Sequence, residues 1–240
     1  AAAPAPPPTV LLTGYAPFDS KSDNPSGDVA KALNGTCAGG ICFDARVLSV
    51  DSHGASSVAS WLAASPTRWS AVLMLGEDVP AMFQSVKLAH LELVAANVRS
   101  HTGVEGGAED DELVDGAQAY LPSTIDASAP AFAAIAAQPN VQWHRDAGTY
   151  FCNEEYYRAL YQVRSTNQSK SGALLPTLFV HLPPPDVMAV AEAQALAVSV
   201  AQAIVGAAPP AAAASPRVLL AGFGDRIGPQ RGGAAALALN

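Results

Sequence analysis

The 240-residue chain has little charge, few basic residues and no long apolar run. Only 14% of the residues are charged whereas 50% are hydrophobic, which excludes a disordered acidic chain and a coiled coil, since both need far more charge. The 13 Lys and Arg face 21 Asp and Glu, and the resulting net charge of -8 repels nucleic acid and anionic membrane surfaces. We therefore expect a globular protein with no nucleic acid and no membrane as partner.

Uninterrupted apolar segments long enough to span a membrane, about 18 residues, are also missing. The nearest candidate, residues 187–205, is rich in alanine and is interrupted by Glu192 and Gln202, which indicates a helix of a soluble protein. The chain length is typical of one large domain. We expect three parts: a Pro/Ala-rich arm over residues 1–8, a single domain over 9–207, and an Ala/Gly/Pro-rich extension of unknown role over 208–240.

Cysteine is scarce, with three in the chain. Cys37 and Cys42 lie close together around two glycines, so a small disulfide loop is possible. The first residues, AAAPAPPP, are typical of a processed terminus from which a signal peptide has been removed. Asn34 and Asn167 each begin an Asn-X-Ser/Thr pattern for N-glycosylation. Together these features predict a secreted, disulfide-bonded glycoprotein, and the alternative is a cytoplasmic protein with reduced thiols.

Short apolar runs alternate with helical patterns along the chain. Strands are expected at residues 9–13, 43–50, 71–76, 90–98, 141–143 and 178–181. Helices are expected at residues 26–33, 55–64, 125–137, 152–163 and 187–205, the last capped by Asp186. Residues 218–223 form one more apolar run, either by chance or as an added edge strand. The alternation predicts an α/β fold whose parallel sheet is covered on both faces.

The third cysteine, Cys152, lies where an apolar approach turns into a helix. The free amide groups and the positive dipole end of that helix would favour a thiolate, which is the nucleophilic form of cysteine. Glu154 and Glu155 oppose this by like charge unless their side chains point into solvent. The alternative is an inert buried cysteine.

A thiol nucleophile needs a proton acceptor, and His181 ends a buried strand where parallel sheets place their ligands. The other histidines compete for this role: His53, His90, His101 and His144, the last being nearest to Cys152 in sequence. Glu92 is a lone acid in an apolar segment and is costly to bury unpaired, so it is the candidate to orient the histidine. A core histidine and a surface salt bridge are the alternatives.

Four segments resemble the pyroglutamyl peptidase I family, cysteine peptidases that remove an N-terminal pyroglutamate. The segment VLLTGYAPFDSKSDNPS resembles the family pattern TGFxPFxxxxxNPS, and LELVAAN resembles PERVAIN. AGTYFCN resembles the nucleophile motif AGTYVCN, and FVHLP resembles FIHVP. The four segments occur in the family's order across residues 10–183, and an ordered set is far more specific than any single motif.

The resemblance implies a three-layer α/β/α sandwich with a twisted, mainly parallel sheet. It also implies that Cys152 is the nucleophile, His181 the general base and Glu92 the group that orients it. Tyr15 and Phe18 match aromatic positions that line the family's lactam pocket, although ordinary packing is the alternative. Asn24 matches an Asn of the same signature, which otherwise stabilises the turn before the following proline. We expect no metal and no cofactor.

One family segment, GQAGGR, is absent after the third strand. The chain instead has Glu77 and Asp78 followed by a segment without Gly-Gly-Arg, in which Gln84 or Lys87 could replace the arginine only by a different route. The two acids would place negative charge at the edge of the pocket and favour substrates with positive charge beyond the scissile bond.

Three functions are compatible with these patterns. The first is hydrolysis of N-terminal pyroglutamyl peptides, and the second is the same chemistry on a different N-acyl amide. The third is a catalytically silent binding module of the same fold. Retention of all three triad residues favours an enzyme that acts on a small peptide or N-acyl amide substrate.

Overall fold

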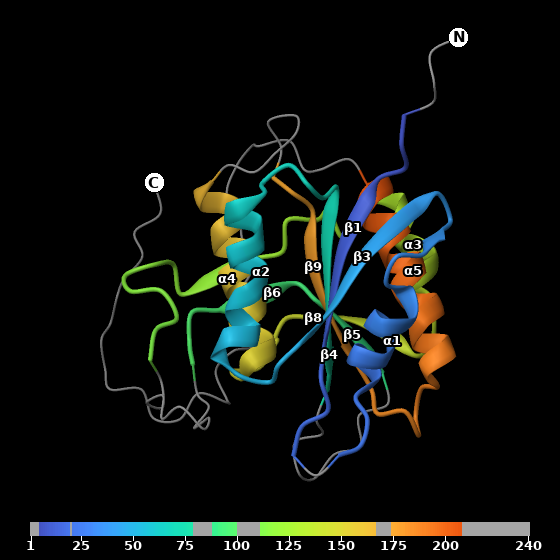
Figure 1. The fold of residues 1–240 in the computed structure, drawn as a ribbon, viewed down its shortest axis with the longest axis horizontal. Helices are drawn as coiled ribbons and strands as arrows, with labels where there is room; N and C mark the ends of the chain where they lie inside the picture. The colour runs from blue at the N-terminus through green and yellow to red at the C-terminus, as the bar shows by residue number, and fades with distance from the viewer. Residues whose placement is uncertain (1–4, 20, 79–87, 100–110, 167–173, 208–240) are drawn as a thin grey trace.

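The computed structural model describes residues 5–19, 21–78, 88–99, 111–166 and 174–207 (Figure 1). Several expectations lie outside these ranges: the extension over 208–240 with its apolar run, the acceptor Asn167, and the residues His101, Gln84 and Lys87.

A seven-stranded sheet runs through the centre of the molecule (Figure 1). In spatial order its strands are β2 (Cys37–Ala38), β3 (Ile41–Leu48), β1 (Thr9–Tyr15), β4 (Ala71–Glu77), β9 (Thr177–Leu182), β5 (Ala89–Glu92) and β8 (Val141–His144). Strands β3, β1, β4 and β9 are parallel, whereas β5 and β8 are parallel to each other and run antiparallel to β9. A second, two-stranded sheet pairs β6 (Val94–Ala96) with β7 (Tyr120–Pro122).

Helices cover both faces of the large sheet (Figure 1). On one side lie α2 (Ser52–Ala64) and α4 (Phe151–Ser165), which pack on each other. On the other side lie α1 (Pro25–Leu33), the short η1 (Pro130–Phe132) with α3 (Ala133–Ala136), and α5 (Val190–Gly206). The expected α/β sandwich with a mainly parallel sheet is confirmed.

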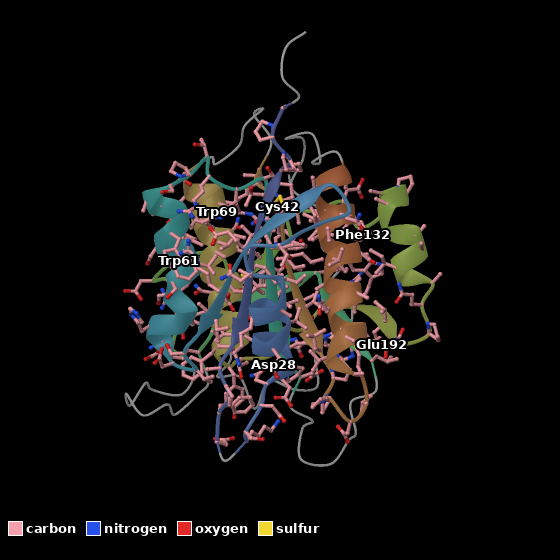
Figure 2. All side chains as sticks on the ribbon, turned by 45° about the vertical axis from the view of Figure 1, so that its right-hand side comes forward. Asp28, Cys42, Trp61, Trp69, Phe132 and Glu192 are labelled. Carbon is pink, nitrogen blue, oxygen red and sulfur yellow. A yellow bond between two sulfur atoms is a disulfide. The ribbon has the colours of Figure 1, made fainter. Side chains whose placement is uncertain are left out.

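Two apolar cores fill the space between the sheet and its helices. Side chains alternate along each strand, so Val10 and Leu12 of β1 pack toward α1 and α5 while Leu11 packs toward α2 and α4. Figure 2 shows side chains on both sides of the sheet, with Trp61 and Trp69 on the α2 side and Phe132 on the opposite side. Each fully buried large apolar side chain contributes about 1.5–3 kcal/mol to folding.

The expected helix over residues 125–137 is only partly confirmed, because helical structure in this segment is confined to η1 and α3. The Asp126 carboxylate accepts hydrogen bonds from the backbone N–H and the hydroxyl of Ser128, which closes a turn instead of a helix. Pro130 then stands at the first position of η1, where its missing N–H costs nothing.

The expected cap at Asp186 is wrong, because α5 begins only at Val190. The N–H groups of Val187 and Met188 donate to the carbonyl of Pro184, so the chain first makes a turn after its three prolines. The N-cap position is Ala189, which has no side-chain hydrogen bond.

The apolar segment 90–98 forms two strands in two different sheets. β5 joins the large sheet and β6 the small one, with the break at Leu93, whose N–H donates to His144 and whose carbonyl accepts from Ser123. This break leaves Glu92 at the end of β5, facing the interior.

At the edge of the sheet, a disulfide joins Cys37 to Cys42. The two residues are direct partners in the antiparallel pair of β2 and β3, around a turn in which Gly39 and Gly40 have positive φ. Among the helices in the described ranges, none is both long and apolar enough to cross a membrane.

Candidate active site

Strand alternation places a set of polar residues on the face of the sheet that meets α4. In β9, Leu178 and Val180 pack on the opposite side, so Phe179 and His181 face α4. The register aligns Gly76 of β4 and His90 of β5 with His181. The side chains of His90 and His181 therefore lie at one level of the sheet, beside Gly76, which has no side chain.

Cys152 lies over this part of the sheet, in the first turn of α4. The neighbouring Asn153 fixes the start of the helix, because its side chain exchanges hydrogen bonds with the backbone of Ala96 at 2.8 and 2.9 Å and also donates to Val98. Tyr156, one turn later, donates from its hydroxyl to the carbonyl of Glu92 at 2.9 Å. The same helix thus positions both Cys152 and the strand that carries Glu92.

The three candidate catalytic residues form a connected chain. The ring of His181 interacts with the thiol of Cys152, and its Nδ1 lies 2.8 Å from Glu92 Oε1. Gly76 leaves room for the thiol, since a Cβ at this position would lie 2.7 Å from Cys152 Sγ. Glu92 is fully buried, so its charge is held by these partners and not by water.

The electrostatics of these three residues favour an ionised Glu92 and a protonated His181. Burial alone would lower the pKa of His181, but its hydrogen bonds and charge interactions with Cys152 and Glu92 raise that pKa well above the usual value. Burial alone would raise the pKa of Glu92, but hydrogen bonds and charge interactions with His144 and His181 lower it. Glu92 is therefore ionised near neutral pH and stabilises a protonated His181.

A second histidine shares the same carboxylate. His144, at the end of β8, places Nδ1 3.0 Å from Glu92 Oε2. The hydrogen bond that His144 donates to Glu92 raises the pKa of His144, while the partial burial of the imidazole opposes the rise. Its ring stacks on that of His90, whose Nδ1 lies 3.0 Å from Asp78 Oδ2.

Sequence reasoning treated His144 and His90 as competitors for the role of base and did not place them at Glu92. A signal was present, because His90 and Glu92 are two residues apart on one strand and therefore share a face. The pairing of β5 with β8, which brings His144 opposite Glu92, is a long-range contact.

The side chains of Glu154 and Glu155 do not point into solvent, since both are fully buried. Glu154 Oε1 is paired with Arg99 at 2.7 Å and with Arg158 at 2.8 Å. Glu155 Oε1 accepts from the hydroxyl of Thr13 at 2.6 Å, whereas its Oε2 has no hydrogen-bond partner among the residues that the structure describes. Burial raises the pKa of Glu155 to about 8, with the hydrogen bond from Thr13 opposing the rise.

The expected pocket residues lie near the start of α4 and α1. Tyr15 is buried and its hydroxyl donates to the carbonyl of Phe151 at 3.0 Å, beside the candidate nucleophile. Phe18 is half-buried, with Lys21 Nζ 5.0 Å from its ring centre. Asn24 is buried and caps α1, because its side-chain oxygen accepts from the backbone and hydroxyl of Ser26.

Glu77 and Asp78 are both paired with other side chains, so they do not present the free negative charge that the sequence predicts. The side chain of Glu77 is only 2% exposed, and its Oε1 lies 2.6 Å from Lys21 Nζ. Asp78 is paired with His90, and this hydrogen bond, with the charges of the nearby imidazoles, outweighs burial and lowers the pKa of Asp78. Because both acids face cationic partners, the prediction that they favour positively charged substrates loses its basis.

The contrast between the cysteines is directly testable. Cys152 is free and partly exposed, whereas Cys37 and Cys42 are in a disulfide. We expect iodoacetamide near neutral pH to alkylate Cys152 alone, because the neighbouring His181 supplies a proton acceptor. Mass mapping of the native protein measures this, and labelling of Cys37 or Cys42 without a reductant would contradict the disulfide.

Comparison with known proteins places this site in a family. The model of the family described as pyroglutamyl peptidase matches residues 8–215. The chain is 32% identical over 192 residues to the pyrrolidone-carboxylate peptidase of Clavibacter michiganensis, an alignment that covers 73% of this chain and 78% of that protein. The pyrrolidone-carboxylate peptidase of Klebsiella pneumoniae is 29% identical over 174 residues, with 72% and 77% covered.

Solved structures have the same fold. A mutant pyrrolidone carboxyl peptidase from Pyrococcus furiosus superposes with a TM-score of 0.69 at 21% identity, covering 82% of this chain and 98% of that one. Pyrrolidone carboxyl peptidase from Thermococcus litoralis gives a TM-score of 0.67 at 20% identity, with 82% and 93% covered. The family model, which spans the whole described domain, and the sequence relatives together lead to one conclusion: this chain belongs to the pyroglutamyl peptidase family.

Proposed function

We propose that the protein is a cysteine peptidase that removes an N-terminal pyroglutamyl group from peptides, with Cys152, His181 and Glu92 as its catalytic triad. The observation that carries the proposal is the position of His181, which interacts with the Cys152 thiol and places its Nδ1 2.8 Å from the buried Glu92, in a member of this family. A thiol, an imidazole and a carboxylate in this order form a complete nucleophilic triad.

The mechanism follows from which atoms face each other. His181 uses Nδ1 toward Glu92, so its Nε2 is the nitrogen that serves Cys152. Nε2 takes the thiol proton while Sγ attacks the carbonyl carbon of the scissile amide, giving a tetrahedral intermediate. His181 then donates the proton to the departing amine as the C–N bond breaks, which leaves a thioester on Cys152. Water, deprotonated by His181, hydrolyses the thioester and frees pyroglutamate and the thiol.

The location of Cys152 helps this reaction. In the first turn of α4 the helix dipole favours negative charge, both on the thiolate and on the oxyanion of the intermediate. Glu92 balances the positive charge that His181 acquires in each step. Each of these effects is strongest in a buried site with a low dielectric constant.

For substrate recognition we propose Tyr15, Phe18 and Asn24. Tyr15, the last residue of β1, is linked through its hydroxyl to the residue before Cys152, and Phe18 lies in the loop that follows β1. Both are therefore suited to hold a flat, uncharged lactam ring. The side-chain oxygen of Asn24 caps α1, and its Nδ2 donates to the carbonyl of Ala16 at 3.2 Å. Its part in recognition is therefore to shape this loop.

The substrate is tested with a panel of fluorogenic amides. We expect cleavage of a pyroglutamyl amide and little cleavage of acetyl, glutamyl and prolyl amides of the same fluorophore. The replaced GQAGGR segment favours a second candidate, in which the same triad accepts another N-acyl group, and preferential cleavage of another amide would select it. Absence of cleavage throughout the panel would contradict both and indicate a binding module.

Replacement of Glu92 by glutamine should lower kcat by about 10²–10⁴-fold and leave measurable activity. The amide no longer balances a protonated His181, but Cys152 and His181 remain in place. Steady-state kinetics with the pyroglutamyl amide measure this effect. Glu192→Gln is the matched control, because Glu192 is exposed at the start of α5. Wild-type turnover in Glu92→Gln would remove Glu92 from the triad.

We also propose that the protein is exported and glycosylated. The Cys37–Cys42 disulfide supports an oxidising compartment. Asn34 is exposed at the end of α1, where an acceptor must be reachable, and the Thr36 hydroxyl of its pattern donates to the carbonyl of Leu33 at 2.8 Å. Release of a glycan from Asn34 by an amidase, seen as a mass change of the protein from its native source, tests the modification. An unmodified Asn34 with reduced Cys37 would support the cytoplasmic alternative.

A further inference from the structure

Two imidazoles gather around the carboxylate of Glu92, the acidic member of the triad. His90, Glu92 and His144 each offer a ligand atom, and these atoms lie within 4.8 Å of one another. They come from two adjacent strands, since His90 and Glu92 share one face of β5 and Glu92 is the register partner of His144 on β8. The sheet itself, and not a mobile loop, therefore holds the three residues together.

The carboxylate of Glu92 contacts both histidines. Oε1 lies 2.8 Å from His181 Nδ1, and His144 Nδ1 lies 3.0 Å from Oε2 and 3.3 Å from Oε1. The ring of His90 stacks on His144 with centres 4.5 Å apart. His90 Nδ1 is occupied by Asp78 at 3.0 Å, which leaves its Nε2 for a further ligand.

We propose that His90, His144 and Glu92 form a binding site for a divalent transition-metal ion of the zinc class. Two histidines and one glutamate are a ligand set that proteins use for zinc, with a fourth position open to water. The pairing of His90 with Asp78 supplies the carboxylate partner that orients metal-binding histidines.

The spacing fits such an ion after small side-chain rotations. Two ligands about 2.0–2.2 Å from a tetrahedral ion lie about 3.3–3.5 Å apart. His144 Nδ1 and Glu92 Oε2, at 3.0 Å, need to separate by only a few tenths of an ångström. The limit of 4.8 Å for the whole cluster means that the widest pair must close by about 1.4 Å, which rotation of a histidine ring can supply.

An entry path exists through His144. Its side chain is 37% exposed, whereas the side chain of Glu92 is completely buried. An ion can thus reach the site from solvent by displacing the hydrogen bond between these two residues.

Occupation of this site would act on the triad through Glu92. An ion bound to Oε2 neutralises the charge that Oε1 presents to His181, so it weakens the interaction that stabilises the protonated imidazole. The reaction itself needs no metal, because sulfur is the nucleophile. The ion is therefore expected to be a reversible inhibitor that binds beside the reacting groups without contacting Cys152.

The test is zinc binding in Cys152→Ala, which removes the thiol as a competing ligand. Competition with a chromogenic chelator should give one tightly bound Zn²⁺ per chain. Adding His144→Gln should weaken this binding at least about 100-fold, since one residue that binds the ion directly is lost. His90→Gln should weaken it similarly, and His53→Gln, which alters an exposed histidine on α2, should leave it unchanged.

Two controls keep the result decisive. Circular dichroism shows whether each variant is folded, and Co²⁺ in place of Zn²⁺ gives visible bands that report tetrahedral coordination without sulfur in the Cys152→Ala background. Absence of zinc binding, or binding of equal strength in the His144→Gln and His53→Gln variants, would overturn the proposal.

The inhibitory effect is measured separately and is the only part that depends on the proposed function. With Cys152 present, the Zn²⁺ concentration that halves activity should be at least about tenfold higher in His144→Gln than in wild type, each relative to its own rate without metal. Zinc binding with no peptidase activity would contradict the proposed function and leave the metal site standing. Zinc binding with equal inhibition in both proteins would overturn the coupling to the triad.

Discussion

Replacement of Cys152 by alanine should abolish hydrolysis of pyroglutamyl amides, with kcat/KM reduced by at least about 10⁴-fold. The reason is chemical, because Cys37 and Cys42, the other two cysteines of the chain, are joined in a disulfide and cannot form the thioester. His181→Ala should have an effect of the same order, since the Cys152 thiol would lose its neighbouring proton acceptor. The double variant should be no worse than either single one, because the two residues act as a unit.

Steady-state kinetics with a pyroglutamyl fluorogenic amide measure these losses. His53→Ala is the control for a change of histidine, since His53 is exposed on α2. Active-site alkylation offers an independent readout, because His181→Ala should also slow the reaction of iodoacetamide with Cys152. Turnover within tenfold of wild type in Cys152→Ala would exclude the proposed nucleophile.

Replacement of Glu155 by glutamine should increase the free energy of unfolding by on the order of 3 kcal/mol at pH 8 and hardly at all near pH 4.5. Glu155 is fully buried, and within the described part of the chain its Oε2 has no hydrogen-bond partner. Glutamine keeps an oxygen that can accept from Thr13, which lies 2.6 Å from Glu155 Oε1. The substitution therefore removes the cost of a buried charge and preserves the existing contact.

The sign of the pH dependence follows from the raised pKa. Glu155 has a pKa of about 8 in the folded state against 4.5 in the unfolded chain. Between these values the folded state keeps a proton that the unfolded state has lost, so the stability of the wild type falls as pH rises through this window. Above about pH 8 both states are ionised and the loss is constant.

Chemical denaturation at several pH values measures the difference between wild type and Glu155→Gln. Glu192→Gln serves as the control, because an exposed carboxylate should show no such pH-dependent gain. An equal difference in stability at pH 4.5 and pH 8 would mean that Glu155 does not titrate in this window.

Local patterns were sufficient for much of the architecture. The buried apolar runs that became β1, β4 and β9, and the spacing of Tyr156, Tyr157 and Leu160 along α4, depend on periodicity within a few residues. The short motifs around Cys152, His181 and Glu92 similarly identified the three residues without knowledge of their distances. Local rules failed where side chains compete with the helix, as at Asp126, or where a turn precedes it, as after Pro184.

What the sequence by itself determined is which residues are the candidates for the chemistry, because a candidate nucleophile, base and acid are recognised by residue type and immediate context. Only the tertiary structure decided their surroundings. The pairing of β5 with β8 places His144 on Glu92, and the packing of α4 on the sheet buries Glu155 against Thr13. These contacts join residues 52 and 142 positions apart, respectively. Charge and burial at such positions depend on which distant strands and helices meet, which no local pattern encodes.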